Sequence, residues 1–219
     1  MPSPAAHGDD LAVDPPVDPA LRAARTRAAL AVRRLAVAMV EHEADPATLD
    51  ALAANVEQLA TDVASAPERA PVEIDLSRIS FEPVADGGDI SGPDYCVFSG
   101  DEHPAGMGAR MWREGDRAIA EVTLTQLEGG PPGRAHGGVI AGLCDDLVRG
   151  LLMVLGVPAF TASLTVNLRA ATPLGAPLRL EAWLDRREGR KLWARIQVLA
   201  DGAPVADGEA LMISFAAPG

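Results

Sequence analysis

The chain has 219 residues, of which 48% are apolar, so it can bury a sizeable core in one substantial domain with a smaller part attached. It carries 31 acidic against 19 basic residues, which excludes a general nucleic-acid binder with its basic face. It has only two cysteines, Cys96 and Cys144, which excludes a disulfide framework and predicts a reducing, cytoplasmic compartment.

The N-terminal residues show neither a targeting signal nor a membrane signal. Residues 1–18 are rich in Pro, Ala and Asp and lack the basic-then-apolar layout of a signal peptide, so we expect a disordered tail. No apolar run is long enough to span a bilayer, because the best candidate, 139–160, is interrupted by charged residues. The chain is therefore predicted to be soluble and to have no membrane partner.

Two amphipathic helices are predicted over 19–43 and 46–64, each opened by an Asp-Pro pair that supplies an N-cap and a first-turn Pro. One face of the first helix is apolar and most of its arginines lie off that face. The second helix has a seam with spacings of three and four: Leu49, Leu52, Val56, Leu59 and Val63. We expect a helical hairpin over 19–66 that acts as a packing or oligomerisation appendage. The alternatives are a lid over an acyl channel and a membrane-surface contact, and the acidic second helix disfavours the latter.

A Pro-containing linker is expected over 67–79, and a strand-rich domain over 80–217. A long helix is predicted from about Gly137 to Leu155, apolar on nearly every side and therefore buried all round, and ended by Gly156-Val157-Pro158. Strands are predicted over 95–98, 108–112, 118–124, 161–168, 177–187, 191–200 and 209–215. One buried helix followed by hairpin-linked strands predicts an α+β fold in which an antiparallel sheet covers the helix.

The loop-to-helix stretch over 130–145 is the most informative segment. A Pro/Gly-rich loop runs into His136-Gly137-Gly138, and an apolar helical run follows with Asp145 two turns in. A helix N-terminus offers unpaired backbone N–H groups and partial positive charge, and glycines let a ligand oxygen approach the backbone closely. The segment can therefore form an oxyanion-type donor site beside a carboxylate base.

Four motifs in this order resemble those of hotdog-fold acyl-CoA thioesterases, above all the phenylacetate-pathway type and the human thioesterase-superfamily acyl-CoA hydrolases. Asp145 follows His136 of the His-Gly-Gly motif by nine positions, and Thr161 follows Asp145 by sixteen. The stretch 163–174 partly matches a strand motif of the subgroup, and Glu188-Gly189-Arg190-Lys191 matches its turn motif in full. The chain departs from the family pattern at Ala170, Ala171 and Arg149.

The resemblance covers roughly residues 95–216 and implies a hotdog fold, an antiparallel sheet wrapped around one long central helix. It implies hydrolysis of an acyl-CoA thioester to free acid and CoA. Asp145 would be the general base or nucleophile, the backbone N–H groups of Gly137 and Gly138 would polarise the carbonyl, and Thr161 would assist. It also implies a homodimer, or a dimer of dimers, whose sites combine the two subunits, and no metal or redox cofactor.

Several assignments stay open at this stage. Because Asp145 is flanked by apolar residues, we expect it not to face bulk water in a monomer, whereas Asp146 is expected to have a surface, interface or cap role. Arg149 can pair with either carboxylate. His136 fits direct acid chemistry or a helix-orienting hydrogen bond.

Two further groups are candidates for substrate binding. His103 lies in a loop that often adjoins the substrate in the family. Arg186, Arg187, Arg190 and Lys191 cluster at one turn, where they are either a solvated hairpin tip or a phosphate clamp for CoA.

Two other functions compete with thioester hydrolysis. A non-catalytic acyl-CoA-binding or regulatory hotdog protein would lack the acid that is present at Asp145. A hotdog hydratase needs an Asp/His dyad on the long helix, and no His follows Asp145 there. The length or aromatic character of the acyl chain and the choice between CoA and a carrier protein are left open by the sequence.

Overall fold

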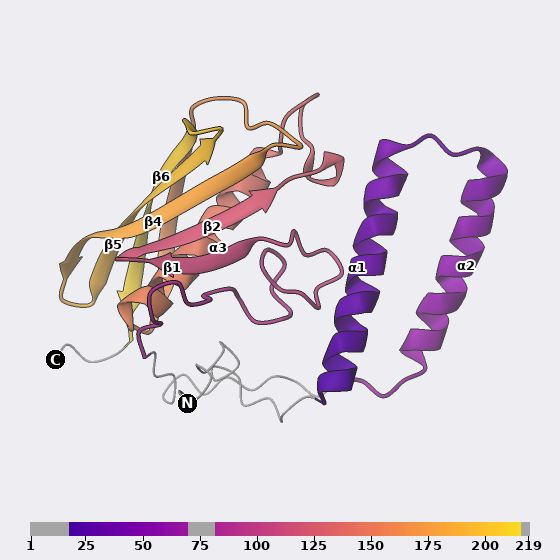
Figure 1. Ribbon diagram of the computed structural model, residues 1–219, viewed down its shortest axis with the longest axis horizontal. Helices are drawn as coiled ribbons and strands as arrows, with labels where there is room; N and C mark the ends of the chain where they lie inside the picture. The colour runs from indigo at the N-terminus through magenta and orange to yellow at the C-terminus, as the bar shows by residue number, and fades with distance from the viewer. Residues whose placement is uncertain (1–17, 70–81, 216–219) are drawn as a thin grey trace.

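The computed structural model describes residues 18–69 and 82–215 (Figure 1). The predicted disordered tail, except for Asp18, and most of the predicted linker lie outside the described residues. The described residues form two helices, α1 and α2, followed by a domain in which a sheet packs on a third helix.

The domain consists of one long helix, α3 (Gly137–Leu155), against an antiparallel sheet with the strand order β1-β2-β4-β5-β6-β3. The strands are β1 (Arg110–Glu114), β2 (Arg117–Thr123), β3 (Ala159–Leu168), β4 (Pro177–Glu188), β5 (Lys191–Ala200) and β6 (Ala203–Ser214). This arrangement confirms the predicted α+β fold and its sheet wrapped around a central helix.

Strict alternation along the central strands explains why the sheet has one face on α3. In β5, Leu192, Ala194, Ile196 and Val198 are buried and the residues between them are more exposed, because successive strand residues point to opposite faces. The same pattern in β4 and β6 delivers a continuous apolar face to the helix. Burial of that face is the main contribution to the stability of the domain.

Both ends of α3 have the caps that its sequence predicts. His136 is the N-cap, and Gly156 ends the helix with a left-handed φ of 64°, a conformation that glycine adopts without strain. The prediction that α3 is buried all round is wrong in the isolated chain. The sheet covers only one side of the helix, so a stripe comprising Gly138, Ala141, Gly142, Asp145 and Arg149 stays exposed or half-exposed.

Two strand predictions also differ from the structure. Residues 95–98 form turns, in which Cys96 N–H donates to the Pro93 carbonyl and Gly100 N–H to the Cys96 carbonyl, so local bonds replace a strand ladder. The last strand, β6, begins six residues before the predicted 209. Asp201 and Gly202, both with positive φ, make the tight turn that lets β6 pair with β5 from its first residue.

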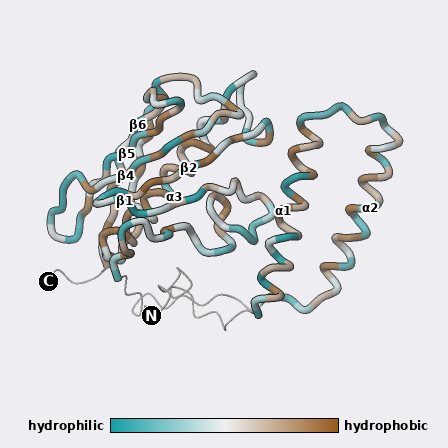
Figure 2. The backbone as a smooth tube through the Cα atoms, viewed as in Figure 1, coloured by the Kyte–Doolittle hydropathy of each residue, from teal (hydrophilic) through white to brown (hydrophobic). Residues whose placement is uncertain are grey.

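Helices α1 (Pro19–Glu41) and α2 (Pro46–Ala64) occupy the predicted positions, with Asp18 and Asp45 as N-caps and Pro at the start of each. They run side by side but do not pack along their lengths (Figure 1), and the predicted α2 seam stays largely exposed. Figure 2 shows apolar and polar positions alternating around both helices. None of the described helices is long and apolar enough to cross a membrane.

Candidate active site

The N-terminus of α3 presents one free backbone donor. The imidazole Nδ1 of His136 accepts a hydrogen bond from Gly138 N–H at 3.0 Å, which is the N-cap bond of the helix. A neutral His136 with Nδ1 as acceptor carries its proton on Nε2, which points away from the cap. Within residues 18–69 and 82–215, Gly137 N–H meets no acceptor, so of the two glycine amides it is the one available to a ligand.

A cavity of about 380 Å³ opens at this N-terminus. Gly137 and Ile140 of α3 form one wall, and Leu168 at the end of β3 and Thr172 form another. A Cβ at position 137 would lie 2.6 Å from the terminal methyl of Leu168, so a larger residue there would require the Leu168 side chain to move. Arg134 and Arg169 line the same cavity, and the Arg169 guanidinium is paired there with the Asp207 carboxylate.

Asp145 lies on the open stripe of α3 and is exposed in the isolated chain. The expectation that it would be shielded in a monomer is therefore wrong, since its apolar neighbours turn toward the sheet while Asp145 points away from it. Its carboxylate and the desolvation of the thiol together raise the pKa of the neighbouring Cys144 to about 12, with burial as the larger cause. Cys144 is thus a protonated core residue and not a nucleophile.

Asp146 has a buried structural environment, and the expected surface, interface or cap role is wrong. Its side chain accepts hydrogen bonds from Ser99 Oγ at 2.7 Å and from Arg149 Nε at 2.8 Å. Arg149 also donates to the Ile90 carbonyl at 3.0 Å. Arg149 could have paired with Asp145 or Asp146, and it pairs with Asp146. Asp146 lies on the flank of α3 that faces the loop of residues 90–99.

Gly137 and Asp145 do not meet within one chain. They are eight residues apart on a straight helix, which separates them by about 12 Å along the axis. A carboxylate that acts on a carbonyl held at Gly137 must lie within about 3.5 Å of the reacting atoms. Within one chain, Gly137 and Asp145 therefore lie at different levels of the helix and cannot reach the same carbonyl.

The strand next to this helix has an unpaired edge. Among the described strands, β3 is the last in the sheet order and pairs with β6 alone. Most of its residues are exposed, including Thr161 and Phe160, the latter with 56% of its surface accessible. A ten-residue edge strand with exposed apolar side chains and little charge is a ready pairing surface for another chain.

His103 lies in the loop between α2 and β1, where its Nδ1 accepts from Ala105 N–H at 3.1 Å and its carbonyl accepts from Arg33 Nε of α1 at 3.0 Å. It is half-buried and far along the chain from the glycine pair. The structure therefore gives His103 a turn-forming role beside α1.

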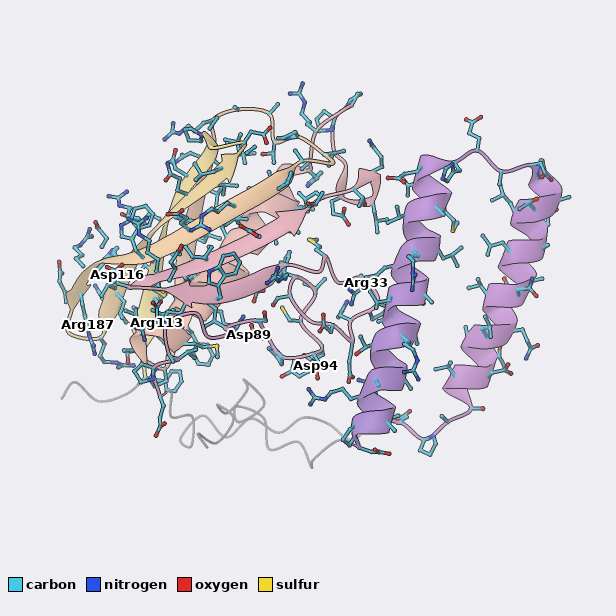
Figure 3. All side chains as sticks on the ribbon, in the orientation of Figure 1. Arg33, Asp89, Asp94, Arg113, Asp116 and Arg187 are labelled. Carbon is cyan, nitrogen blue, oxygen red and sulfur yellow. The ribbon has the colours of Figure 1, made fainter. Side chains whose placement is uncertain are left out.

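The basic cluster lies at the β4–β5 turn, at the other end of the sheet from Gly137 (Figure 3, where Arg187 marks the turn). The Arg186 guanidinium stacks on the Trp193 ring at 4.1 Å, and Arg190 Nε donates to the Ser214 carbonyl at 2.6 Å. Lys191 is exposed. The strand register aligns this turn with the start of β3, whereas the cavity lies at the end of β3.

Sequence reasoning missed four residues that the structure brings to this region. Arg134 and Arg169 line the cavity, Ser99 bonds Asp146, and Phe98 packs on α3 at Gly142. Arg134 stands two residues before His136, so its proximity to the helix N-terminus was available as a signal. The other three contacts join segments distant in sequence. In the described part of the chain, no three His, Cys, Asp or Glu side chains gather as metal ligands would.

The long central helix, the antiparallel sheet around it and the glycine-capped cavity define a hotdog-fold protein. The solved thioesterase-superfamily protein RHA08564 is similar to 86% of this chain and 94% of its own, with a TM-score of 0.73 and 28% identity.

Two curated proteins match a part of the chain. Acyl-coenzyme A thioesterase THEM4 of Xenopus laevis is 35% identical over 69 residues, and THEM5 of Homo sapiens is 33% identical over 64 residues. The matches span 32% and 29% of this chain but only 31% and 26% of those relatives. No protein-family model matches the chain. The predicted resemblance to the hotdog-fold acyl-CoA thioesterase superfamily is confirmed.

Proposed function

We propose that the protein hydrolyses an acyl-CoA thioester to a free acid and CoA. The proposal depends on one observation: helix α3 carries both a free terminal amide, Gly137 N–H, at an open cavity and an exposed carboxylate, Asp145. The acyl-coenzyme A thioesterase names of the partial relatives supply the substrate class.

The site is completed by a second copy of the chain. Because β3 is an open edge, two copies can pair antiparallel along β3, and the two α3 helices then run in opposite directions. Antiparallel helices bring the Asp145 level of one copy toward the Gly137 level of the other, which removes the separation of about 12 Å within one chain. A homodimer with two composite sites follows, with Gly137 and Asp145 of each site on different subunits.

In such a site the thioester carbonyl oxygen accepts from Gly137 N–H, whose donor strength is raised by the helix dipole. Asp145 either takes a proton from a water that attacks the carbonyl carbon or attacks that carbon itself, and water then hydrolyses the anhydride formed. In both routes the C–S bond breaks and CoA leaves as the thiolate, which then takes up a proton. Thr161, exposed on β3, positions the attacking water at the subunit boundary.

His136 acts through the helix cap. Its Nδ1 accepts from Gly138 N–H, which fixes the first turn of α3 and leaves Gly137, a residue that lines the cavity, with the unbonded amide. The β3 pairing also brings the partner's β4–β5 turn toward the end of the sheet where the cavity lies. Arg190 and Lys191 of that turn would then bind the phosphates of CoA through charge-assisted hydrogen bonds.

A hydrolysis screen tests the proposal directly. Purified wild-type protein is incubated with short, medium, long and aryl acyl-CoAs, and released CoA is measured, with Asp145→Asn as the inactive control. Hydrolysis by the wild type alone supports the proposal. Absence of CoA release across all substrate classes, or equal release by both proteins, would contradict it.

A further inference from the structure

The loop of residues 94–106, which we call the Phe98 loop, precedes β1 in the chain and contacts both α1 and α3. It contains no helix or strand and consists of turns. Turn bonds occupy some of its backbone carbonyls, such as those of Asp94 and Cys96, and others need partners from outside the loop.

Helix α1 supplies those partners through its arginine-bearing face. Arg33 Nε donates to the His103 carbonyl at 3.0 Å, and Arg33 Nη2 donates to the carbonyls of Gly100 at 3.1 Å and Asp101 at 2.6 Å. Figure 3 shows Arg33 between α1 and this loop. A Cβ at Gly106 would press on the same guanidinium at 3.0 Å, so the Phe98 loop fits closely around Arg33.

Two ion pairs extend the same contact. Arg22 lies 2.8 Å from the Asp94 carboxylate, and Arg25 lies 3.6 Å from that of Glu102, whose side chain is only 6% exposed. A buried carboxylate that loses its cation is costly, so the Arg25 contact favours one position of α1 on the loop. Ala29 is buried between these arginines and lets the helix backbone approach.

The other side of the Phe98 loop is fastened to α3. Ser99 donates to the buried Asp146 carboxylate at 2.7 Å and accepts from Gly92 N–H at 2.7 Å. The Phe98 ring packs on Gly142 so closely that a Cβ there would overlap the ring. Gly142 is one turn before Asp145, and both belong to the open stripe of α3.

We propose that α1 is a clamp that holds the Phe98 loop against α3, and that Phe98 limits the size of the acyl group accepted beside Asp145. The second part depends on the proposed thioester hydrolysis. An acyl group whose carbonyl carbon lies at Asp145 extends along the open stripe or away from it, and the Phe98 ring covers the stripe one turn to the N-terminal side. Tyr95 and Val97, 45% and 37% exposed, continue this apolar surface in the same loop.

The clamp is tested in the full-length protein with a matched pair of variants. Arg33→Gln removes three bonds to the loop. The matched variant Arg34→Gln, one residue on, changes a side chain whose bond among the described residues is to the Leu30 carbonyl of its own helix. Hydrogen exchange is followed at Gly100, Glu102 and Gly106, whose amides are bonded within the loop. Exchange should speed up by about tenfold or more in Arg33→Gln and stay unchanged in Arg34→Gln, because charged hydrogen bonds contribute that much. Equal exchange in the two variants would overturn the clamp.

The size limit is tested with Phe98→Ala, Gly142→Ala and the double variant. Phe98→Ala should raise the ratio of kcat/KM for long over short acyl-CoAs by about tenfold, since each methylene in a pocket changes selectivity by that order. Gly142→Ala should lower kcat/KM because its Cβ overlaps the ring, and the double variant should recover most of the loss. A ratio unchanged within twofold in Phe98→Ala would overturn the size limit.

Binding of S-alkyl-CoA thioethers separates this proposal from the proposed function, because thioethers are not hydrolysed. Calorimetric binding by the wild type, with Phe98→Ala shifted toward longer alkyl chains, supports the size limit even if no acyl-CoA is cleaved. Absence of both hydrolysis and thioether binding by the wild type would overturn the proposed function and the size limit together. The exchange measurement would still decide on the clamp.

Discussion

The adjacent carboxylates Asp145 and Asp146 give the sharpest prediction, because the structure assigns them opposite environments. Asp145 is exposed and Asp146 is 6% exposed with two side-chain partners. We expect Asp145→Asn to lower kcat by two to four decades, the usual effect of losing a positioned general base, or by more if Asp145 is the nucleophile. Its free energy of unfolding should change by no more than about 0.5 kcal/mol, as for an exposed substitution.

Asp146→Asn should show the reverse pattern. An amide can keep the bond from Ser99 but cannot neutralise Arg149, whose side chain is 29% exposed and so is partly compensated by water. The loss should be about 1–3 kcal/mol. For a protein of this size it lowers Tm by roughly 3–10 °C. Because Asp146 touches no reacting atom, kcat at a temperature where the variant is folded should fall less than about tenfold.

Three measurements on each variant decide the assignment: differential scanning calorimetry, kcat with a short acyl-CoA, and oligomeric state by light scattering. Oligomeric state is included because Asp145 lies on the side of α3 that a second copy would cover. If Asp145→Asn retains more than half of the wild-type kcat, the role given to it is wrong. If instead Asp146→Asn loses several decades of kcat with an unchanged Tm, the roles of the two residues are exchanged.

Three further outcomes follow from the geometry. Arg190→Ala should raise KM for acyl-CoA more than it lowers kcat, and the effect should vanish with an acyl-pantetheine lacking the nucleotide phosphates. Equal KM changes on both substrates would remove the phosphate clamp. If the proposed dimer forms, Ser163→Lys with Thr165→Lys on the open edge of β3 should give monomers by light scattering and abolish hydrolysis, because like charges then oppose one another across antiparallel strands. Full activity in a monomer would refute the composite site. Cys144, with its pKa raised to about 12, is deprotonated in roughly one molecule in ten thousand at pH 8. Iodoacetamide should therefore modify at most Cys96 in the native protein and both thiols in urea, as counted by mass spectrometry, and rapid modification of native Cys144 would contradict its burial.

Local signals were enough to predict the helices and most strands. Helix ends are marked by the Asp-Pro pairs at 18–19 and 45–46 and by the left-handed Gly156. Their hydrogen bonds span only a few residues, so these ends can be predicted without tertiary information. Strand alternation in 177–187 and 191–200 reports burial of one face directly. Residues 95–98 failed this test because a short apolar run is equally consistent with a loop that other segments cover.

The burial of individual site residues depended on partners distant in the chain. Nothing near Asp145 and Asp146 in sequence distinguishes them, since both follow the same apolar run. Asp146 is buried because Ser99, 47 positions earlier, meets it. The docking face of α1 was missed for the same reason. The apolar side of α1 has the expected spacing, but it is Arg33 that contacts the domain, because it donates hydrogen bonds to three backbone carbonyls of the loop.

Two features could be read from the amino-acid order: a helix start with paired glycines and an acid two turns in, and the succession of helices and strands that carries it. They could be read because propensity, capping and periodicity act over a few residues. The tertiary structure alone decided which side of α3 the sheet leaves open, that Asp146 is buried against Ser99 while Asp145 stays exposed, and that Arg33 of α1 meets the loop of residues 94–106. These outcomes arise from the packing of segments that only the folded chain brings into contact.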